Sequence, residues 1–218
     1  MERYRLPDID EKPACVVLAA GDFPCGELTM ALLDGAECVI CCDSAAEAFC
    51  ARRGEPAAIV GDMDSLPESL SKRFAERVVV RPEQDVNDLW KGLTYAIEQG
   101  FYDITVLGAF GRREDHSIGN IMLLAARLHD ARLRVVGEQG VFDFIDEPSM
   151  FESFAGQQVS LFTIDPKTEI SVRGLRYDPP QNHLAAMWQG VSNESLGEEF
   201  EITTNGTTIV YRLLQPKR

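Results

Sequence analysis

The sequence predicts an α/β protein in which a doubly wound, mostly parallel sheet is followed by a small antiparallel, sandwich-like β domain. Three observations support this prediction. The chain has 218 residues, 45% of them hydrophobic, which is enough apolar material for one large domain or two small ones. Up to about residue 147, short apolar runs alternate with helix-like segments. Beyond that point, turn signals separate short segments of alternating polarity.

Six short runs rich in Val and Ile predict the strands of the sheet. They are Ala14–Ala20, Glu37–Cys42, Ala57–Val60, Val78–Val80, Ile104–Leu107 and Leu133–Val136. Because the runs are nearly continuous in apolar residues, they are typical of parallel strands covered on both faces. Helical stretches lie between them, at Leu28–Leu33, Ala45–Arg53, Ser69–Glu76, Asp88–Glu98 and Asn120–His129. Strands and helices in turn imply right-handed crossovers and a Rossmann-like sheet.

The pattern changes near Asp146-Glu-Pro148, so we expect an α/β domain over residues 1–147 and a β domain over residues 148–218. Strands of the second domain are predicted at Gln158–Ile164, Glu169–Val172, His183–Met187, Phe200–Thr203 and Thr208–Leu213. Asn205-Gly206 between the last two predicts a β-hairpin. The first 12 residues form a charged extension for which the sequence indicates no role.

Composition excludes several classes of protein. The chain has 21 Lys and Arg against 35 Asp and Glu, a net charge of −14, which argues against a general nucleic-acid binder. No apolar stretch approaches the ~20 residues that a membrane helix needs, so we expect a soluble, cytoplasmic protein. All six cysteines lie in the first 50 residues. Three of them fall within the apolar run Cys38–Cys42, which predicts buried thiols rather than zinc ligands.

Aspartates follow five consecutive predicted strands. They are Asp22, Asp43, Asp62 with Asp64, Asp85 with Asp88, and Asp115. Because ligands of a doubly wound sheet bind outside the carboxyl ends of its strands, we expect these side chains at one edge. Crowded carboxylates require positive charge, and Mg²⁺ commonly bridges carboxylates to phosphates. Position and chemistry therefore predict a Mg-dependent nucleotide or phosphoryl-transfer site.

Glycines and arginines beside the acids suit phosphate groups. Glycine lets backbone N–H groups approach a phosphate, and Arg112 and Arg113 offer forked donors. The candidate nucleotide site therefore includes Gly21, Asp22, Gly61, Gly108 and Gly111. Asp22 alone is as readily a capping residue, and His116 is as readily an ordinary loop histidine as a nucleotide contact.

The motifs along the chain have a recognisable order. They are Asp43-Ser-Ala-Ala46, Gly61-Asp-Met-Asp-Ser65, Glu83-Gln-Asp-Val-Asn-Asp88 with Lys91, Gly108-Ala-Phe-Gly-Arg-Arg-Glu-Asp-His116 with Asn120, Gly174-Leu-Arg-Tyr177 and Ser192-Asn-Glu194. In this order they resemble the thiamine pyrophosphokinase (thiamin diphosphokinase) family, from Val17 to about Leu213. The resemblance implies transfer of the pyrophosphoryl group of ATP to the hydroxyl of thiamine, which releases AMP, with Mg²⁺ as cofactor.

The resemblance also implies roles for residues at the matching positions. Mg²⁺ would be held by Asp43, Asp62, Asp64 and Asp88, and the nucleotide by Arg113, Asp115, His116 and Asn120. Gln84 and Lys91 would lie beside the transferred group, and Asp85 and Asp88 are both candidates for accepting the alcohol proton. Thiamine would contact Tyr177, Ser192 and Asn193. The family is a homodimer with the active site at the subunit interface.

Four departures from the family pattern affect expected substrate contacts. Ser44-Ala45 replaces Gly-Gly, Asn87 replaces Thr, Arg112 replaces Gly and Tyr177 replaces Trp. Two alternative functions therefore stay open at this point. One is a Mg-dependent phosphohydrolase acting on a similar acidic edge. The other is a catalytically silent module that binds thiamine or a nucleotide.

Overall fold

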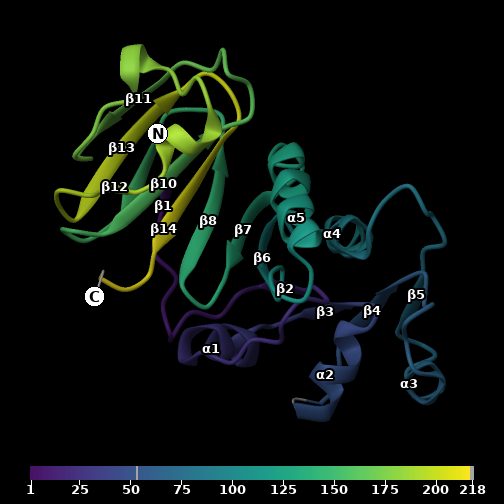
Figure 1. Ribbon diagram of the computed structural model, residues 1–218. Helices are drawn as coiled ribbons and strands as arrows, with labels where there is room; N and C mark the ends of the chain where they lie inside the picture. Colours follow the sequence, from purple (N-terminus) through teal and green to yellow (C-terminus); the bar gives the residue numbers. More distant parts are fainter. Residues whose placement is uncertain (53, 217–218) are drawn as a thin grey trace. The chain divides into compact units, whose positions relative to one another are not determined.

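The computed structural model describes residues 1–52 and 54–216, which form two compact units (Figure 1). The first comprises Asp8–Glu138, and we call it the α/β unit. The second, the β unit, combines Met1–Pro7 with the chain from Gln139 onward. The division therefore falls earlier than the expected boundary after residue 147. The reason is that residues 140–145 form a strand that pairs with the strand at 208–213.

Six parallel strands form the sheet of the α/β unit, in the spatial order β7-β6-β2-β3-β4-β5. They are β2 (Cys15–Leu18), β3 (Val39–Cys42), β4 (Ala58–Gly61), β5 (Val78–Val80), β6 (Asp103–Leu107) and β7 (Arg132–Val136). The predicted mixed α/β fold with a mostly parallel sheet is confirmed. Residues of β2, β3 and β4 are buried throughout, as expected for strands covered on both faces. The strand order reverses direction between β2 and β6, where ligands of such sheets bind.

Five helices connect these strands. They are α1 (Glu27–Gly35), α2 (Ala45–Arg52), α3 (Glu68–Arg73), α4 (Asp88–Glu98) and α5 (Glu114–Ala126). Figure 1 shows α4 and α5 on one face of the sheet and α1 and α2 on the other. Helix α4 lies close to the sheet because Gly92 has no side chain. A Cβ there would lie 2.8 Å from Cys42 Sγ.

Among the helix boundaries, the start of α5 differs most from the prediction. Helix α5 begins at Glu114 rather than Asn120, so Asp115 and His116 belong to its first turn instead of a loop. Acidic residues in a first turn are favourable because they face the positive end of the helix dipole. The predicted end of α2, Arg53, lies outside the described residues.

The strands of the β unit lie in two sheets. Their orders are β1-β9-β13-β11 and β12-β10-β14-β8. The strands are β1 (Glu2–Tyr4), β8 (Gly140–Ile145), β9 (Ser149–Glu152), β10 (Gln158–Thr163), β11 (Ile170–Arg173), β12 (Asn193–Glu194), β13 (Glu199–Thr204) and β14 (Thr208–Leu213). One hydrophobic cluster draws side chains from both sheets, including Phe151 and Phe200 from one and Leu161 and Val210 from the other. All strand pairs except β1–β9 are antiparallel, so the predicted antiparallel β region is confirmed.

The N-terminal residues are part of this unit and not a free extension. Strand β1 pairs in parallel with β9, and Tyr4 is buried against Phe151, with ring centroids 4.9 Å apart. Arg212, fully buried, donates to the carbonyl oxygens of Tyr4 and Arg5 at 3.2 and 3.0 Å and to Asp143 at 2.7 Å. These contacts link residues 69 to 208 positions apart, which a local pattern cannot indicate.

Two further predictions in the β unit are wrong. Residues 183–187 form no strand, because only His183 pairs, in an isolated bridge with Glu169, before the turn η2 (Met187–Gly190). Asn205-Gly206 lies between β13 and β14 but forms no hairpin, since these strands belong to different sheets. Of the three cysteines expected to be buried, Cys41 and Cys42 are buried, whereas Cys38, which directly precedes β3, is only half-buried.

Candidate active site

The carboxyl ends of the parallel strands bring aspartates together, beginning with Asp43 directly after β3. The register pairs Cys42 with Val60 and Gly61 with Val80, so the loops after β3, β4 and β5 leave the sheet at one edge. Asp43 is 2% exposed and its backbone φ is +39°, an unusual conformation for a residue other than glycine. Its Oδ2 accepts the Ser65 N–H at 3.3 Å, whereas its buried Oδ1 has no hydrogen-bond partner among the described residues.

A carboxylate that is buried without a partner is costly to ionise, and the pKa of Asp43 is raised accordingly. Burial, followed by the charge of Asp88, raises the pKa of Asp43 to about 6, against the opposing effect of the Ser65 N–H. A buried polar atom without a partner requires an explanation, and one explanation is a cation that the site is built to bind. The charge of such a cation would offset this cost.

Asp62 and Asp64 complete a group of three carboxylates after β4. One oxygen of each, with one of Asp43, lies within 4.8 Å of the others. The Asp64 N–H and the Gln84 amide, which donates at 3.0 Å, lower the pKa of Asp62 below its ordinary value. Ser65 Oγ donates to Asp64 Oδ1 at 2.8 Å. Carboxylate oxygens in a close group are the ligands that Mg²⁺ prefers, so these three residues fit the predicted metal site.

Asp88 and Lys91 lie beside this group, on the first turn of α4. Lys91, 4% exposed, has its Nζ 3.0 Å from Asp88 Oδ1 and 3.7 Å from Asp62 Oδ2. Burial lowers the pKa of Lys91, but the hydrogen bond to Asp88 and the two carboxylate charges outweigh it and raise the pKa. A permanent positive charge is therefore fixed between two of the predicted catalytic acids. Asp88 faces the neighbouring cavity but is not one of the three grouped carboxylates.

Two of the predicted aspartates lie away from the acid group. Asp85 is exposed and lines no part of the cavity described below. Asp22 is also exposed, and its carboxylate lies against Gly111, where a Cβ would come within 2.0 Å of Asp22 Oδ2. Gly111 has φ +84°, so both its conformation and the space around it require glycine.

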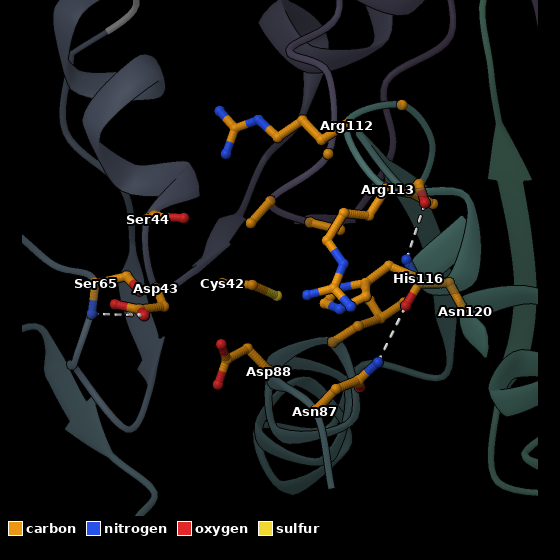
Figure 2. A pocket seen from close by; sticks show the side chains of 16 residues that line it. Cys42, Asp43, Ser44, Ser65, Asn87, Asp88, Arg112, Arg113, His116 and Asn120 are labelled. Carbon is orange, nitrogen blue, oxygen red and sulfur yellow. Dashed lines mark hydrogen bonds between the residues drawn. The ribbon is translucent and has the colours of Figure 1, made fainter. Parts of the chain in front are cut away.

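A cavity of about 280 Å³ opens beside the acids and is shown in Figure 2. Asp43 and Ser44 line it on the side of β3, Asp88 on the side of α4, and Arg113, His116 and Asn120 on the side of α5. Gly21 and Gly111, both predicted for the nucleotide, line it as well, whereas Gly61 and Gly108 do not. The structure thus brings Asp43, Asp88 and five of the nine predicted nucleotide residues to one hollow.

The predicted nucleotide residues in and just before α5 differ in the hydrogen bonds that hold their side chains. Arg113 donates to both oxygens of Asp115, at 3.1 and 2.6 Å, and this contact lowers the pKa of Asp115. Asp115 lies outside the residues that line the cavity. Asn120 is buried and donates to the Ala109 carbonyl at 2.9 Å, while its Oδ1 accepts from Asn87 at 3.1 Å.

Asn87 and Cys42 line the cavity but were not predicted site residues. Asn87 is the N-cap of α4, because its side chain accepts the Trp90 N–H at 3.0 Å while its amide reaches Asn120. It therefore connects the start of the helix that bears Asp88 to α5. An Asn directly before a helix with an acidic first residue is a recognisable capping signal, but the link to Asn120 is a tertiary contact that no spacing indicates.

The residues predicted for thiamine lie in the β unit. Asn193 is buried: its Oδ1 accepts the Tyr177 N–H at 3.1 Å and its Nδ2 donates to the Tyr177 carbonyl at 2.7 Å. Ser192 has φ +64°, and its N–H donates to Ser160 Oγ at 3.1 Å. The Tyr177 ring is 61% exposed. The Asn193 amide therefore fixes the backbone that presents this ring.

Comparison with protein families agrees with this arrangement. The model of the thiamin pyrophosphokinase catalytic domain matches residues 29–136, and that of the thiamin pyrophosphokinase substrate-binding domain matches residues 140–211. The chain belongs to the thiamin pyrophosphokinase family. Its enzymatic activity is accordingly that of a thiamine diphosphokinase. The two matched ranges fall within the α/β unit and the β unit, respectively.

Solved structures of thiamin pyrophosphokinases share the fold. The enzyme from Bacillus subtilis is 22% identical, with a TM-score of 0.75 over 91% of this chain and 98% of its own. The enzyme from Candida albicans is 16% identical, with a TM-score of 0.78 over 98% and 93%. The yeast enzyme is 15% identical, with a TM-score of 0.74 over 97% and 90%. No curated protein matches the chain. Within the described residues, no helix has the length and apolar character needed to cross a membrane.

Proposed function

We propose that the chain transfers the pyrophosphoryl group of ATP to thiamine at the aspartate edge of the α/β unit. The observation that supports this most directly is the buried Asp43, with one oxygen unpartnered and two further aspartates in reach. ATP would bind in the adjoining cavity, at the point where the strand order reverses. This position also fits the Rossmann-like interpretation of the sheet.

In this proposal Asp43, Asp62 and Asp64 hold Mg²⁺, and Asp88 contributes from α4 as the resemblance implies. The unpartnered Asp43 Oδ1 supports this assignment because a carboxylate oxygen buried without a donor is suited to a cation. Bound Mg²⁺ would neutralise the charge of the ATP phosphates. Lys91 holds Asp88 and Asp62 in place and supplies a second positive charge beside the transferred group, near the Gln84 amide.

The nucleotide contacts would come from the cavity wall formed by the loop after β6 and the start of α5. Gly21 and Gly111 line this cavity as well, and Arg113, His116 and Asn120 offer donors. Asp115 orients the Arg113 guanidinium through its two hydrogen bonds. Because both side chains are more than 60% exposed, their pairing is weak enough to rearrange around a ligand.

The transfer itself requires positioning and one proton acceptor. The thiamine hydroxyl oxygen bonds to the β-phosphorus of ATP as the bond to the oxygen bridging the α- and β-phosphates breaks, and AMP leaves. The hydroxyl proton passes to a carboxylate. Asp88 is better supported than Asp85 as that carboxylate, because Asp88 lines the cavity and Asp85 does not.

Thiamine would be recognised by Tyr177, Ser192 and Asn193 of the β unit. The exposed Tyr177 ring offers an aromatic face for stacking. Following the resemblance, we propose a homodimer in which one subunit's α/β unit and the partner subunit's β unit contribute to each active site, in the cytoplasm. Neither a phosphohydrolase nor a silent binding module is favoured by a specific observation.

Product analysis tests the proposal. The protein is incubated with thiamine, ATP and Mg²⁺, and the nucleotides and thiamine species are resolved by chromatography. We expect AMP and thiamine pyrophosphate in equal amounts, and neither product when EDTA replaces Mg²⁺. Consumption of ATP without thiamine would instead support the phosphohydrolase. Intact ATP in the complete mixture would contradict the proposal.

A further inference from the structure

Arg112 lines the cavity in a backbone conformation that is unfavourable for arginine. It lies in the loop between β6 and α5 with φ +58°, in the left-handed region. A residue with a Cβ loses free energy there, whereas glycine does not. Strained residues of this kind persist where surrounding structure or function maintains them. The Arg112 side chain is exposed, so burial in a core does not explain its retention.

The charges around the cavity distinguish Arg112 from its neighbour. Two arginines line the cavity, together with the carboxylates of Asp43 and Asp88. Arg113 is already engaged with Asp115 through two hydrogen bonds. Arg112 forms no hydrogen bond and no ion pair with any residue in the described part of the chain. All N–H donors of the Arg112 guanidinium are therefore available to a ligand.

The directions of the two side chains also differ. In Figure 2 Arg113 points into the cavity, whereas Arg112 extends across its upper side, toward the side on which Ser44 precedes α2. A guanidinium in that position lies at the wall of the cavity, where an anionic ligand bound in the cavity would be in reach. Because its planar fork matches two oxygens of one phosphate, it suits a phosphate ester better than a single carboxylate.

We propose that Arg112 binds the polyphosphate of the nucleotide and is a specificity-determining residue for it. This inference rests on the proposed function, because it assumes that the cavity binds Mg-ATP. The arginine and the metal-holding aspartates would then contact the phosphates from different sides of the cavity. The backbone strain at position 112 is maintained because a forked cation at this point contributes to nucleotide affinity.

Because the backbone at Arg112 is strained, replacing this residue by glycine should not destabilise the protein, so a loss of binding can be separated from a loss of folding. Arg112→Gly removes the guanidinium but relaxes the left-handed backbone, so its melting temperature should equal or exceed that of the wild type. Arg112→Lys keeps the charge without the fork. Lys72→Ala removes one positive charge from the exposed surface of α3, outside the cavity, and serves as the matched control.

Isothermal titration of each variant with Mg-ATP and with adenosine, in the absence of thiamine, measures the effect. We expect Arg112→Gly to bind Mg-ATP about 10- to 100-fold more weakly, as for loss of a charge-assisted hydrogen bond. Its adenosine affinity should stay within about twofold, Arg112→Lys should be intermediate, and Lys72→Ala should resemble the wild type.

Two results would overturn the inference: unchanged Mg-ATP affinity in Arg112→Gly, or equal losses for Mg-ATP and adenosine. In either case, a wild-type protein that binds Mg-ATP leaves the proposed function intact. If the wild type itself bound no Mg-ATP, the proposed function would fail, and this inference with it.

Discussion

At the aspartate edge of the α/β unit, the buried Asp43 Oδ1 has no partner, whereas the Asn193 amide of the β unit is hydrogen-bonded at both its oxygen and its nitrogen. In the first region, a buried carboxylate oxygen is therefore still available to bind a ligand. The second uses its buried group to hold the backbone and leaves aromatic side chains exposed, with Tyr177 61% and Trp188 74% exposed. We infer that the first region is organised to receive charge and the second to present a flat apolar face.

Backbone strain is found in both regions. The non-glycine residues with positive φ in the described chain all lie in them: Asp43, Met63 and Arg112 beside the cavity, and Gln181, Asn182 and Ser192 around the Tyr177 segment. Strain of this kind gathers at functional sites because function, rather than stability, determines the local conformation. The comparison thus predicts large effects on turnover at the aspartate edge and smaller effects on thiamine affinity in the β unit.

The largest effect is expected from removing charge in the acid group. Asp62→Asn or Asp64→Asn should each lower kcat by about 10²- to 10³-fold, because in the proposed function these carboxylates hold the Mg²⁺ that would neutralise charge in the transition state. Both variants should still fold, although Asp62→Asn loses a charge that its hydrogen-bond donors and Lys91 favour and should melt at a slightly lower temperature. Asp103→Asn, at the opposite edge of the same sheet, is the matched control and should retain activity. Near-normal turnover in both acid variants would be inconsistent with the site.

An intermediate effect is expected in the β unit. Two variants there distinguish the Tyr177 ring, which would contact thiamine, from the Asn193 amide, which holds the Tyr177 backbone in place. Tyr177→Ala should raise the KM for thiamine about tenfold with little change in kcat for saturated enzyme, because only stacking is lost. Asn193→Ala should raise the same KM and also destabilise the protein by about 1–3 kcal/mol, because partners of a buried amide are left unsatisfied. Steady-state kinetics and thermal unfolding measure both. A kcat loss in Tyr177→Ala as large as that in Asp62→Asn would remove the contrast between the two regions.

The smallest effect concerns the pH dependence of stability without metal. The pKa of Asp43 in the folded protein is about 6, above its ordinary value of 3.8. A raised carboxyl pKa favours the protonated folded state, so the stability it provides is present at low pH and lost as the pH rises through about 6. Relative to Asp43→Asn, the melting temperature of metal-free wild type should therefore fall by about 3–6 °C between pH 5 and 7.5. A difference that is constant with pH would contradict this electrostatic account.

The sequence indicated the aspartate edge well because strand ends are local features. Asp43 and Asp62 follow apolar runs, and parallel strands place such ends at one edge whatever the rest of the fold does. Asp85 could not be separated from Asp88 in this way. Three residues apart at a helix start, they differ in exposure only once α4 packs against β3 and β4.

Features that depend on long-range contacts were not predictable. Residues 2–4 form a strand only because β9 pairs with them, and Arg212 secures their carbonyls from the far end of the chain. Asn205-Gly206 has the composition of a hairpin turn, yet β13 and β14 pair within different sheets. Likewise, the engagement of Arg113 by Asp115 and the absence of a partner for Asp43 Oδ1 follow from side-chain positions that a motif does not specify.

The most direct test of the aspartate edge is a titration of wild type and Asp43→Asn with Mn²⁺, followed by electron paramagnetic resonance, with Mg²⁺ as competitor. The unpartnered Asp43 oxygen predicts saturable Mn²⁺ binding to the wild type that Mg²⁺ displaces. It also predicts binding at least about tenfold weaker in Asp43→Asn, with thermal unfolding intact. Equal affinity in the two proteins, or no saturable binding to the wild type, would contradict the account.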